Sequence, residues 1–177
     1  MAKKPTILLT RRLPPAVTAR AERDYEARTN PEDRLLGDSI PVRAAGCDGL
    51  LICSSEQMTA GLIRQLPASV KMIATFSVGY EHIDVQAARA CGITVSNTPD
   101  VLNDATADMA MLLLLAASRR GYEGNATVRE DRWGGWHALM LLGLQVTGKR
   151  LGIYGMGRIG QAVARRARGF GMSIHYH

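Results

Sequence analysis

A glycine-rich turn carries the clearest chemical signal in the sequence. It reads Gly155-Met156-Gly157-Arg158-Ile159-Gly160, after an apolar run at 151–154 and before a stretch with apolar residues at helical spacing. In such a strand–turn–helix the first glycine permits the tight turn, the second lets a diphosphate approach the backbone, and the third lets the helix pack on the strand. The N–H groups and dipole at the helix start favour phosphate charge. The pattern therefore predicts a dinucleotide site at Gly155, Gly157 and Gly160, with a purely structural turn as the competing interpretation.

The rest of the sequence shows short apolar runs that alternate with helix-like stretches, which is typical of an α/β protein with a mostly parallel sheet. Strands are expected at 6–9, 49–53, 71–76, 93–96, 151–154 and 173–176. Helices are expected after Pro14, after N-caps at Thr59 and Asp84, from 103 or 104 to 120, over a stretch that includes 125–132, and after the glycine turn. The segment 30–45 has too weak a pattern for a prediction.

The long helix over 104–120 is unusual because its middle, 109–117, is apolar all round. A helix without a polar face is buried on all sides, so this one is expected to pack against other domains or another subunit. The apolar run is far shorter than the ~20 residues that cross a bilayer, and no membrane segment is expected.

Composition favours a protein that binds neither nucleic acid nor a structural metal. The net charge is +6, but the basic residues are spread along the chain and aromatic residues make up only 5% of it. A solvated basic surface explains this pattern better than a nucleic-acid surface. The three cysteines, Cys47, Cys53 and Cys91, lack metal-ligand spacing, and their odd number with no secretory signal predicts reduced thiols in the cytoplasm.

Several stretches together resemble the D-isomer-specific 2-hydroxyacid dehydrogenases, especially their glyoxylate/hydroxypyruvate reductase branch. The matching stretches are 75–84 (TFSVGYEHID), 95–99 (VSNTP), 105–108 (ATAD) and 142–153, which runs into the glycine turn. They span about the last two thirds of the chain, and their order and spacing make the resemblance specific.

The resemblance implies a flavodoxin-like substrate domain over 1–100, followed over 101–177 by the first part of a Rossmann dinucleotide-binding domain, which is truncated. Only 22 residues follow Gly155, whereas a βαβ unit needs ~30. The catalytic arginine, glutamate and histidine of the family are expected beyond His177, so the chain by itself is expected to be unstable and inactive. None of the four histidines, His82, His137, His175 and His177, matches the catalytic one, and each is interpreted as a surface or packing residue.

The resemblance also assigns candidate site residues. Val78 and Gly79 match the substrate loop, where successive N–H groups at a strand end can form an anion nest for a carboxylate; an ordinary turn remains the alternative. Ser54 and Ser55 end another strand on the same expected rim; they are weaker substrate candidates, with ordinary turn residues as the favoured alternative. Thr106 matches a position near the nicotinamide, or is simply a first-turn helix residue. Arg158 and Ile159 match the pair that contacts the diphosphate.

The function implied is hydride transfer between NAD(P)H and a small 2-oxo acid such as glyoxylate or hydroxypyruvate. NAD and NADP both remain open, with a slight preference for NADP, and a homodimer through the 104–120 helix is expected. Two alternatives stay open. One is a dinucleotide-sensing binding protein, like the transcriptional corepressors of the same fold, and the other is an inactive truncation product.

Overall fold

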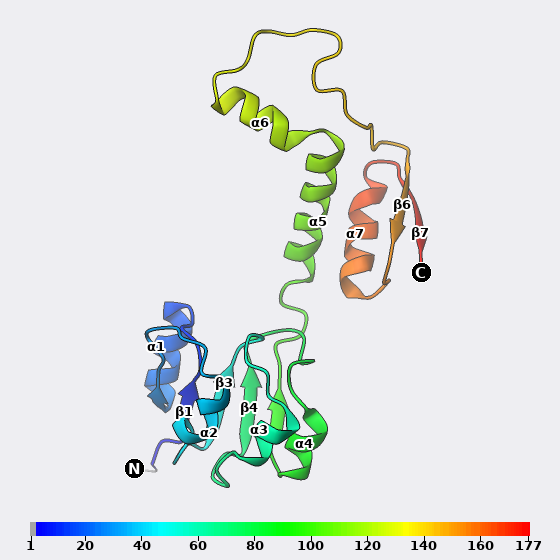
Figure 1. The fold of residues 1–177 in the computed structure, drawn as a ribbon. Helices are drawn as coiled ribbons and strands as arrows, with labels where there is room; N and C mark the ends of the chain where they lie inside the picture. The colour runs from blue at the N-terminus through cyan, green and yellow to red at the C-terminus, as the bar shows by residue number, and fades with distance from the viewer. Residues whose placement is uncertain (1–2) are drawn as a thin grey trace. The chain divides into compact units, whose positions relative to one another are not determined.

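The protein is described by a computed structural model that covers residues 3–177 of the chain. The chain divides into two compact units: the first ends at Val101, and the second runs from Leu102 to His177. Figure 1 shows the elements of both units, which are described one at a time below.

The first unit is a five-stranded parallel sheet with helices on both faces. Its elements in chain order are β1 Thr6–Leu9, α1 Pro15–Asp24, β2 Glu26–Arg28, the short 3₁₀ helix η1 Gly37–Ser39, α2 Ile40–Arg43, β3 Gly49–Ile52, α3 Ala60–Arg64, β4 Met72–Thr75, α4 Val85–Ala90 and β5 Thr94–Ser96. The strand order is β2-β1-β3-β4-β5, and every pair is parallel. This is the flavodoxin-like order, which confirms the predicted fold class.

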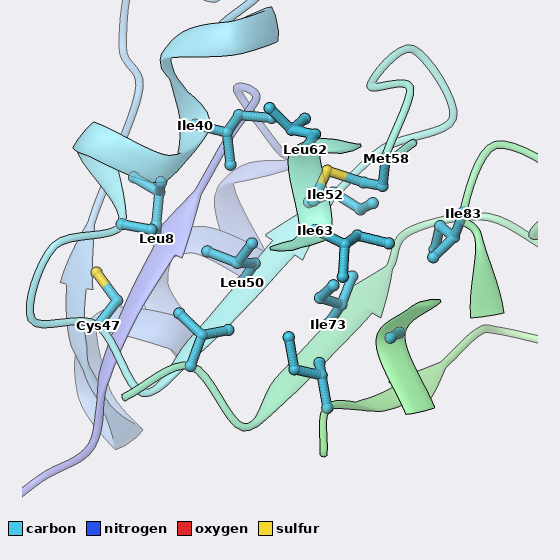
Figure 2. Packing of buried hydrophobic residues seen from close by; sticks show 14 of the residues in the cluster. Leu8, Ile40, Cys47, Leu50, Ile52, Met58, Leu62, Ile63, Ile73 and Ile83 are labelled. Carbon is cyan, nitrogen blue, oxygen red and sulfur yellow. The ribbon is translucent and has the colours of Figure 1, made fainter. Parts of the chain in front are cut away.

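Alternate residues of the central strands supply two separate cores. In β3, Leu50 and Ile52 pack in the larger core with residues of α2, α3 and α4, whereas Leu51 faces the smaller core with α1. Figure 2 shows the larger core, in which Ile40, Ile52 and Ile73 are completely buried. Because side chains alternate along a strand, burial on both faces gives the continuous apolar runs seen in the sequence.

Two short helices of this unit begin where their capping residues predict. The Thr59 hydroxyl accepts a hydrogen bond from the Leu62 N–H at 3.3 Å, and the Asp84 carboxylate accepts one from the Ala87 N–H at 2.8 Å. Both predicted N-caps are thus confirmed, and they place the starts of α3 and α4 beyond the ends of β3 and β4.

The second unit contains α5 Asn103–Ser118, α6 Gly121–Arg129, β6 Arg150–Ile153, α7 Arg158–Arg168 and β7 Ser173–Tyr176. Strands β6 and β7 pair in parallel around α7, as in the first βαβ step of a dinucleotide-binding domain. Met111 of α5 packs with Ala167 and Met172 in a small core. Arg166 joins the same two helices, because its guanidinium lies 3.1 Å from the Asp104 carboxylate and 2.6 Å from that of Asp108.

The helices of the second unit depart from the prediction in two ways. Helix α6, which was expected to include 125–132, ends at Arg129; it begins at Gly121, after Arg120 in a left-handed conformation with φ 52°. The apolar middle of α5 is also not buried on all sides within this chain: Met111 is buried, but Met109, Leu112 and Leu113 are 53–61% exposed.

Candidate functional site

The glycine turn connects β6 to α7, and its three glycines have three different environments. Gly155 has φ +94°, a conformation that L-residues rarely adopt. A Cβ atom at Gly157 would meet nothing within 4 Å, whereas a Cβ atom at Gly160 would lie 2.2 Å from the Gly155 carbonyl oxygen. The turn is therefore open at Gly157 and tightly packed at Gly160, which is the shape a diphosphate cradle requires.

The start of α7 presents backbone donors beside this opening. Gln161 makes the first hydrogen bond of the helix, from its N–H to the Gly157 carbonyl at 2.9 Å. The N–H groups of Ile159 and Gly160 precede it in the first turn, where an α-helix supplies no backbone acceptor. Together with the helix dipole, these groups favour an anion at this position. The residues present thus fit the diphosphate of a dinucleotide.

Thr106 is exposed in the first turn of α5, the helix that packs on α7. Its N–H donates to the Leu102 carbonyl at 2.9 Å. The ion pairs of Arg166 with the first turns of α5 hold the two helices together within the second unit. Thr106 and the glycine turn therefore belong to the same packed pair of helices.

The candidate substrate residues lie in the first unit, at the ends of neighbouring strands. Ser54 follows β3, and the Val78–Gly79 loop follows β4. The register pairs Ile52 with Thr75 at the last step of the two strands. Because the strands are parallel, both loops leave the same edge of the sheet, where open α/β sheets bind ligands. Ser54 is exposed in this turn.

Hydrogen bonds hold the carbonyl groups of the Val78–Gly79 loop. The Asn97 side-chain amide donates to the Val78 carbonyl at 2.7 Å, and the Thr98 N–H donates to the Ser77 carbonyl at 3.0 Å. The Ser77 hydroxyl donates to the Gly79 carbonyl at 2.8 Å. Within residues 3–177 the Val78 and Gly79 N–H groups donate to no protein acceptor. Two adjacent donors thus remain available for an anion.

The sequence did not indicate that Ser77 and Asn97 hold the carbonyl groups of this loop. Serine and asparagine after strands are ordinary turn residues, and only the fold brings Asn97 to a carbonyl 19 positions earlier in the chain.

A second polar cluster fixes the loop that carries Ser54 and Ser55, and its members Arg11, Asp33 and Glu56 were not predicted from the sequence. Glu56 is fully buried, and its carboxylate accepts hydrogen bonds from the Cys53 N–H and the Ser55 hydroxyl, both at 3.1 Å. Arg11, beyond the end of β1, donates to the Ser55 hydroxyl at 3.0 Å and to the Asp33 carboxylate at 2.8 Å. The cluster lies where the strand order reverses between β1 and β3, and it ties the β3 loop to the β1 loop.

Asp33 makes the stability of this cluster depend on pH. The hydrogen bond from Arg11, followed by one from the Arg12 N–H, lowers the pKa of Asp33 to about 2. A lowered pKa stabilises the folded state above the unfolded value of about 3.9, and this contribution disappears as the pH falls towards 2.

We therefore expect Asp33→Asn to lower the melting temperature of the full-length protein at pH 7. The difference from wild type should shrink between about pH 4 and pH 2, where the wild-type carboxylate becomes protonated. Asparagine tolerates the left-handed backbone of residue 33, which has φ 54°. Thermal melts across this range test the prediction, with exposed Asp38→Asn as the control. A difference that stays constant with pH would contradict it.

The described residues give little support for a metal site, a cysteine nucleophile or a membrane-spanning helix. Within the part of the chain that the structure describes, no three His, Cys, Asp or Glu residues are grouped to hold a metal ion. Burial raises the pKa of the Cys47 and Cys53 thiols, which disfavours a thiolate nucleophile at either position. None of the helices over residues 3–177 combines the length and apolar character needed to cross a bilayer.

Comparison with known proteins identifies relatives of this chain. The chain is 44% identical over 177 residues to the glycerate dehydrogenase of Hyphomicrobium methylovorum, covering 99% of this chain and 55% of that protein. A putative D-isomer specific 2-hydroxyacid dehydrogenase from Polaromonas sp. JS6 66 has 51% identity and a TM-score of 0.90, over 99% of this chain and 55% of that one.

A third relative has a structure with bound ligands. The NADPH-dependent glyoxylate/hydroxypyruvate reductase of Sinorhizobium meliloti, in complex with NADP and malonate, is 32% identical with a TM-score of 0.82, over 99% of this chain and 53% of that one. The chain therefore spans about half the length of the relatives it matches. The sequence model of one family, described as "D-isomer specific 2-hydroxyacid dehydrogenase, catalytic domain", matches residues 7–170. The resemblance expected from the sequence is confirmed: the chain belongs to the D-isomer specific 2-hydroxyacid dehydrogenase family.

Proposed function

We propose that the full-length protein transfers hydride between NAD(P)H and a small 2-oxo acid, with glyoxylate and hydroxypyruvate as the first candidates. The observation that carries this proposal is the β6–α7 turn, whose open Gly157 and helix start fit a dinucleotide diphosphate. The names of the relatives, glycerate dehydrogenase and glyoxylate/hydroxypyruvate reductase, support this class of substrate.

The two units would divide the work between them. We assign the cofactor to the second unit, where Gly155, Gly157 and the 158–160 backbone would hold the diphosphate and Thr106 would lie towards the nicotinamide. When bound, the cofactor supplies the hydride. We assign the substrate to the first unit, where the Val78 and Gly79 N–H groups would hold the carboxylate and Ser54 would line the same rim. Two charge-assisted hydrogen bonds would orient the 2-oxo carbon before reaction.

The test of this function is oxidation of NADPH and NADH by the purified full-length protein with glyoxylate and with hydroxypyruvate. We expect turnover with at least one of the two acids, and no turnover with either acid would contradict the proposal. For the cofactor we propose a preference for NADP(H), which is supported by the NADPH-dependent relative. A lower KM for NADPH than for NADH is the expected result. The three free cysteines fit the reducing cytoplasm in which we propose that the protein acts.

We also propose that α5 forms the interface of a homodimer. Met109, Leu112 and Leu113 are more than half exposed, and a soluble helix rarely leaves neighbouring large apolar residues in water. Leu113→Glu should place a charge in this interface and convert the full-length dimer to a monomer, as measured by light scattering. Leu35→Glu in the first unit is the matched control, because Leu35 is 60% and Leu113 61% exposed. Dissociation of both variants, or of neither, would contradict this assignment.

A further inference from the structure

The orientation of the Val78–Gly79 donors is set by residues that do not themselves contact an anion. A trans peptide group is planar, and its C=O and N–H point in opposite directions. The carbonyl of Val78 and the N–H of Gly79 belong to one such group, as do the carbonyl of Ser77 and the N–H of Val78. A partner that holds either carbonyl therefore also aims the N–H on the other side of the same peptide.

The structure supplies one such partner for each of the two peptides. The Asn97 amide lies 2.7 Å from the Val78 carbonyl oxygen, so it fixes the direction of the Gly79 N–H. The Thr98 N–H lies 3.0 Å from the Ser77 carbonyl oxygen, so it fixes the direction of the Val78 N–H. Both partners follow β5, the strand that pairs with β4. The neighbouring strand thus holds both carbonyls, and both N–H groups point away from it.

A series of hydrogen-bonded side chains holds the carbonyl of Gly79, which belongs to the peptide group after Gly79. The direction of each hydrogen bond in this series can be deduced. The Ser77 hydroxyl donates its only hydrogen to the Gly79 carbonyl, so in its 2.7 Å contact with the Thr75 hydroxyl it must accept. Thr75 then donates its own hydrogen to Ser77, and in its 3.0 Å contact with His82 it must accept from Nε2–H. Each group therefore donates to the next: His82 donates to Thr75, Thr75 to Ser77, and Ser77 to the Gly79 carbonyl.

We propose that Asn97 is a positioning residue that aims the Gly79 N–H at the substrate carboxylate, and that Ser77, through Thr75 and His82, holds the loop around it. The inference rests on the proposed function for the identity of the anion. The orientation of the Gly79 N–H by Asn97 does not depend on that function. Gly79 itself is a poor test of this role, because a Cβ atom there would lie 2.4 Å from a Glu81 carboxylate oxygen.

The first experiment measures kinetics in the full-length protein. Asn97→Ala is expected to raise KM for the 2-oxo acid about five- to tenfold, the worth of one neutral hydrogen bond. KM for NAD(P)H should change less than about twofold. Asn30→Ala is the matched control, because the Asn30 amide also donates to backbone carbonyls, those of Thr10 and Arg34, at 2.7 Å. A purely structural role predicts the same result for both variants, namely a lower melting temperature without a selective change in KM.

The role of Ser77 in this hydrogen-bond network is tested in the same assay by comparing a variant that loses the hydroxyl group with one that keeps it. Ser77→Ala removes the donor to the Gly79 carbonyl, whereas Ser77→Thr keeps a hydroxyl group at this position. We expect a severalfold higher KM for the 2-oxo acid in the first variant and recovery in the second. Equal KM values for the wild type, Ser77→Ala and Ser77→Thr would remove Ser77 from the proposal.

The second experiment does not depend on activity. Residual dipolar coupling of the Gly79 N–H, in full-length protein labelled with ¹⁵N-glycine, reports the direction of this bond. We expect the coupling to change in Asn97→Ala and to stay unchanged in Asn30→Ala. An unchanged coupling in Asn97→Ala overturns the inference. A changed coupling in a protein that reduces no 2-oxo acid supports the orienting role of Asn97 and contradicts the proposed function instead.

Discussion

Gly157→Val is expected to weaken NAD(P)H binding to the full-length protein by about a hundredfold. The space around Gly157 is open to 4 Å, so the new side chain fits the protein but occupies the path by which a diphosphate reaches the backbone. Loss of two charge-assisted hydrogen bonds, at about 1.5 kcal/mol each, corresponds to roughly this factor. Titration calorimetry with NADPH and NADH measures the effect.

Two further variants separate the loss of affinity from a loss of stability. Gly157 is the N-cap of α7, where valine is a poor residue and serine a good one. Gly157→Ser should therefore keep the helix start intact and still lose affinity, because its Cβ and hydroxyl enter the same space. Gly134→Val, in an open loop where a Cβ also meets nothing within 4 Å, should bind normally. Wild-type affinity in Gly157→Val would contradict the assignment of the turn as a cofactor site.

The elements that the sequence predicted well are those determined by local patterns. The β3 strand shows as an apolar run because both of its faces are buried, and α3 and α4 show through N-caps whose hydrogen bonds span three residues. Strand β2 has no such pattern: Glu26–Arg28 is a short edge strand held by its ladder to β1, with exposed or half-buried side chains. Its pairing partner lies 20 residues away, and nothing in its own sequence indicates a strand.

The two candidate sites also differ in how far local sequence patterns predict them. The glycine turn is contiguous in sequence, so its residues and their spacing could be identified from the sequence alone. The Val78–Gly79 loop was visible too, but the groups that aim it come from the end of β5, and those that fix Ser54 come from the ends of β1 and β3. Such partners are brought together only by the order of strands in the sheet, which no single stretch of sequence encodes.

A side chain at Gly160, the last glycine of the turn, is expected to reduce the stability of the fold, whereas one at Gly157 is expected to reduce cofactor affinity. Gly160→Ala would place a Cβ atom 2.2 Å from the Gly155 carbonyl oxygen and 3.4 Å from the Ile153 side chain, where helix α7 meets strand β6. Backbone cannot move aside as a flexible side chain can, so the helix must shift from the strand. We expect a loss of about 1–3 kcal/mol in the free energy of unfolding, which is typical of overpacking.

Denaturant unfolding of the full-length protein measures this loss, and Gly61→Ala is its matched control. Gly61 also lies within a helix, α3, but its Cβ atom would come no closer than 3.9 Å to the Thr59 hydroxyl. Alanine should stabilise that helix by up to about 1 kcal/mol through its higher helix propensity. The same substitution should thus have opposite signs at the two positions. Equal stability of Gly160→Ala and wild type would mean that the close approach of α7 to β6 is not what requires a glycine there.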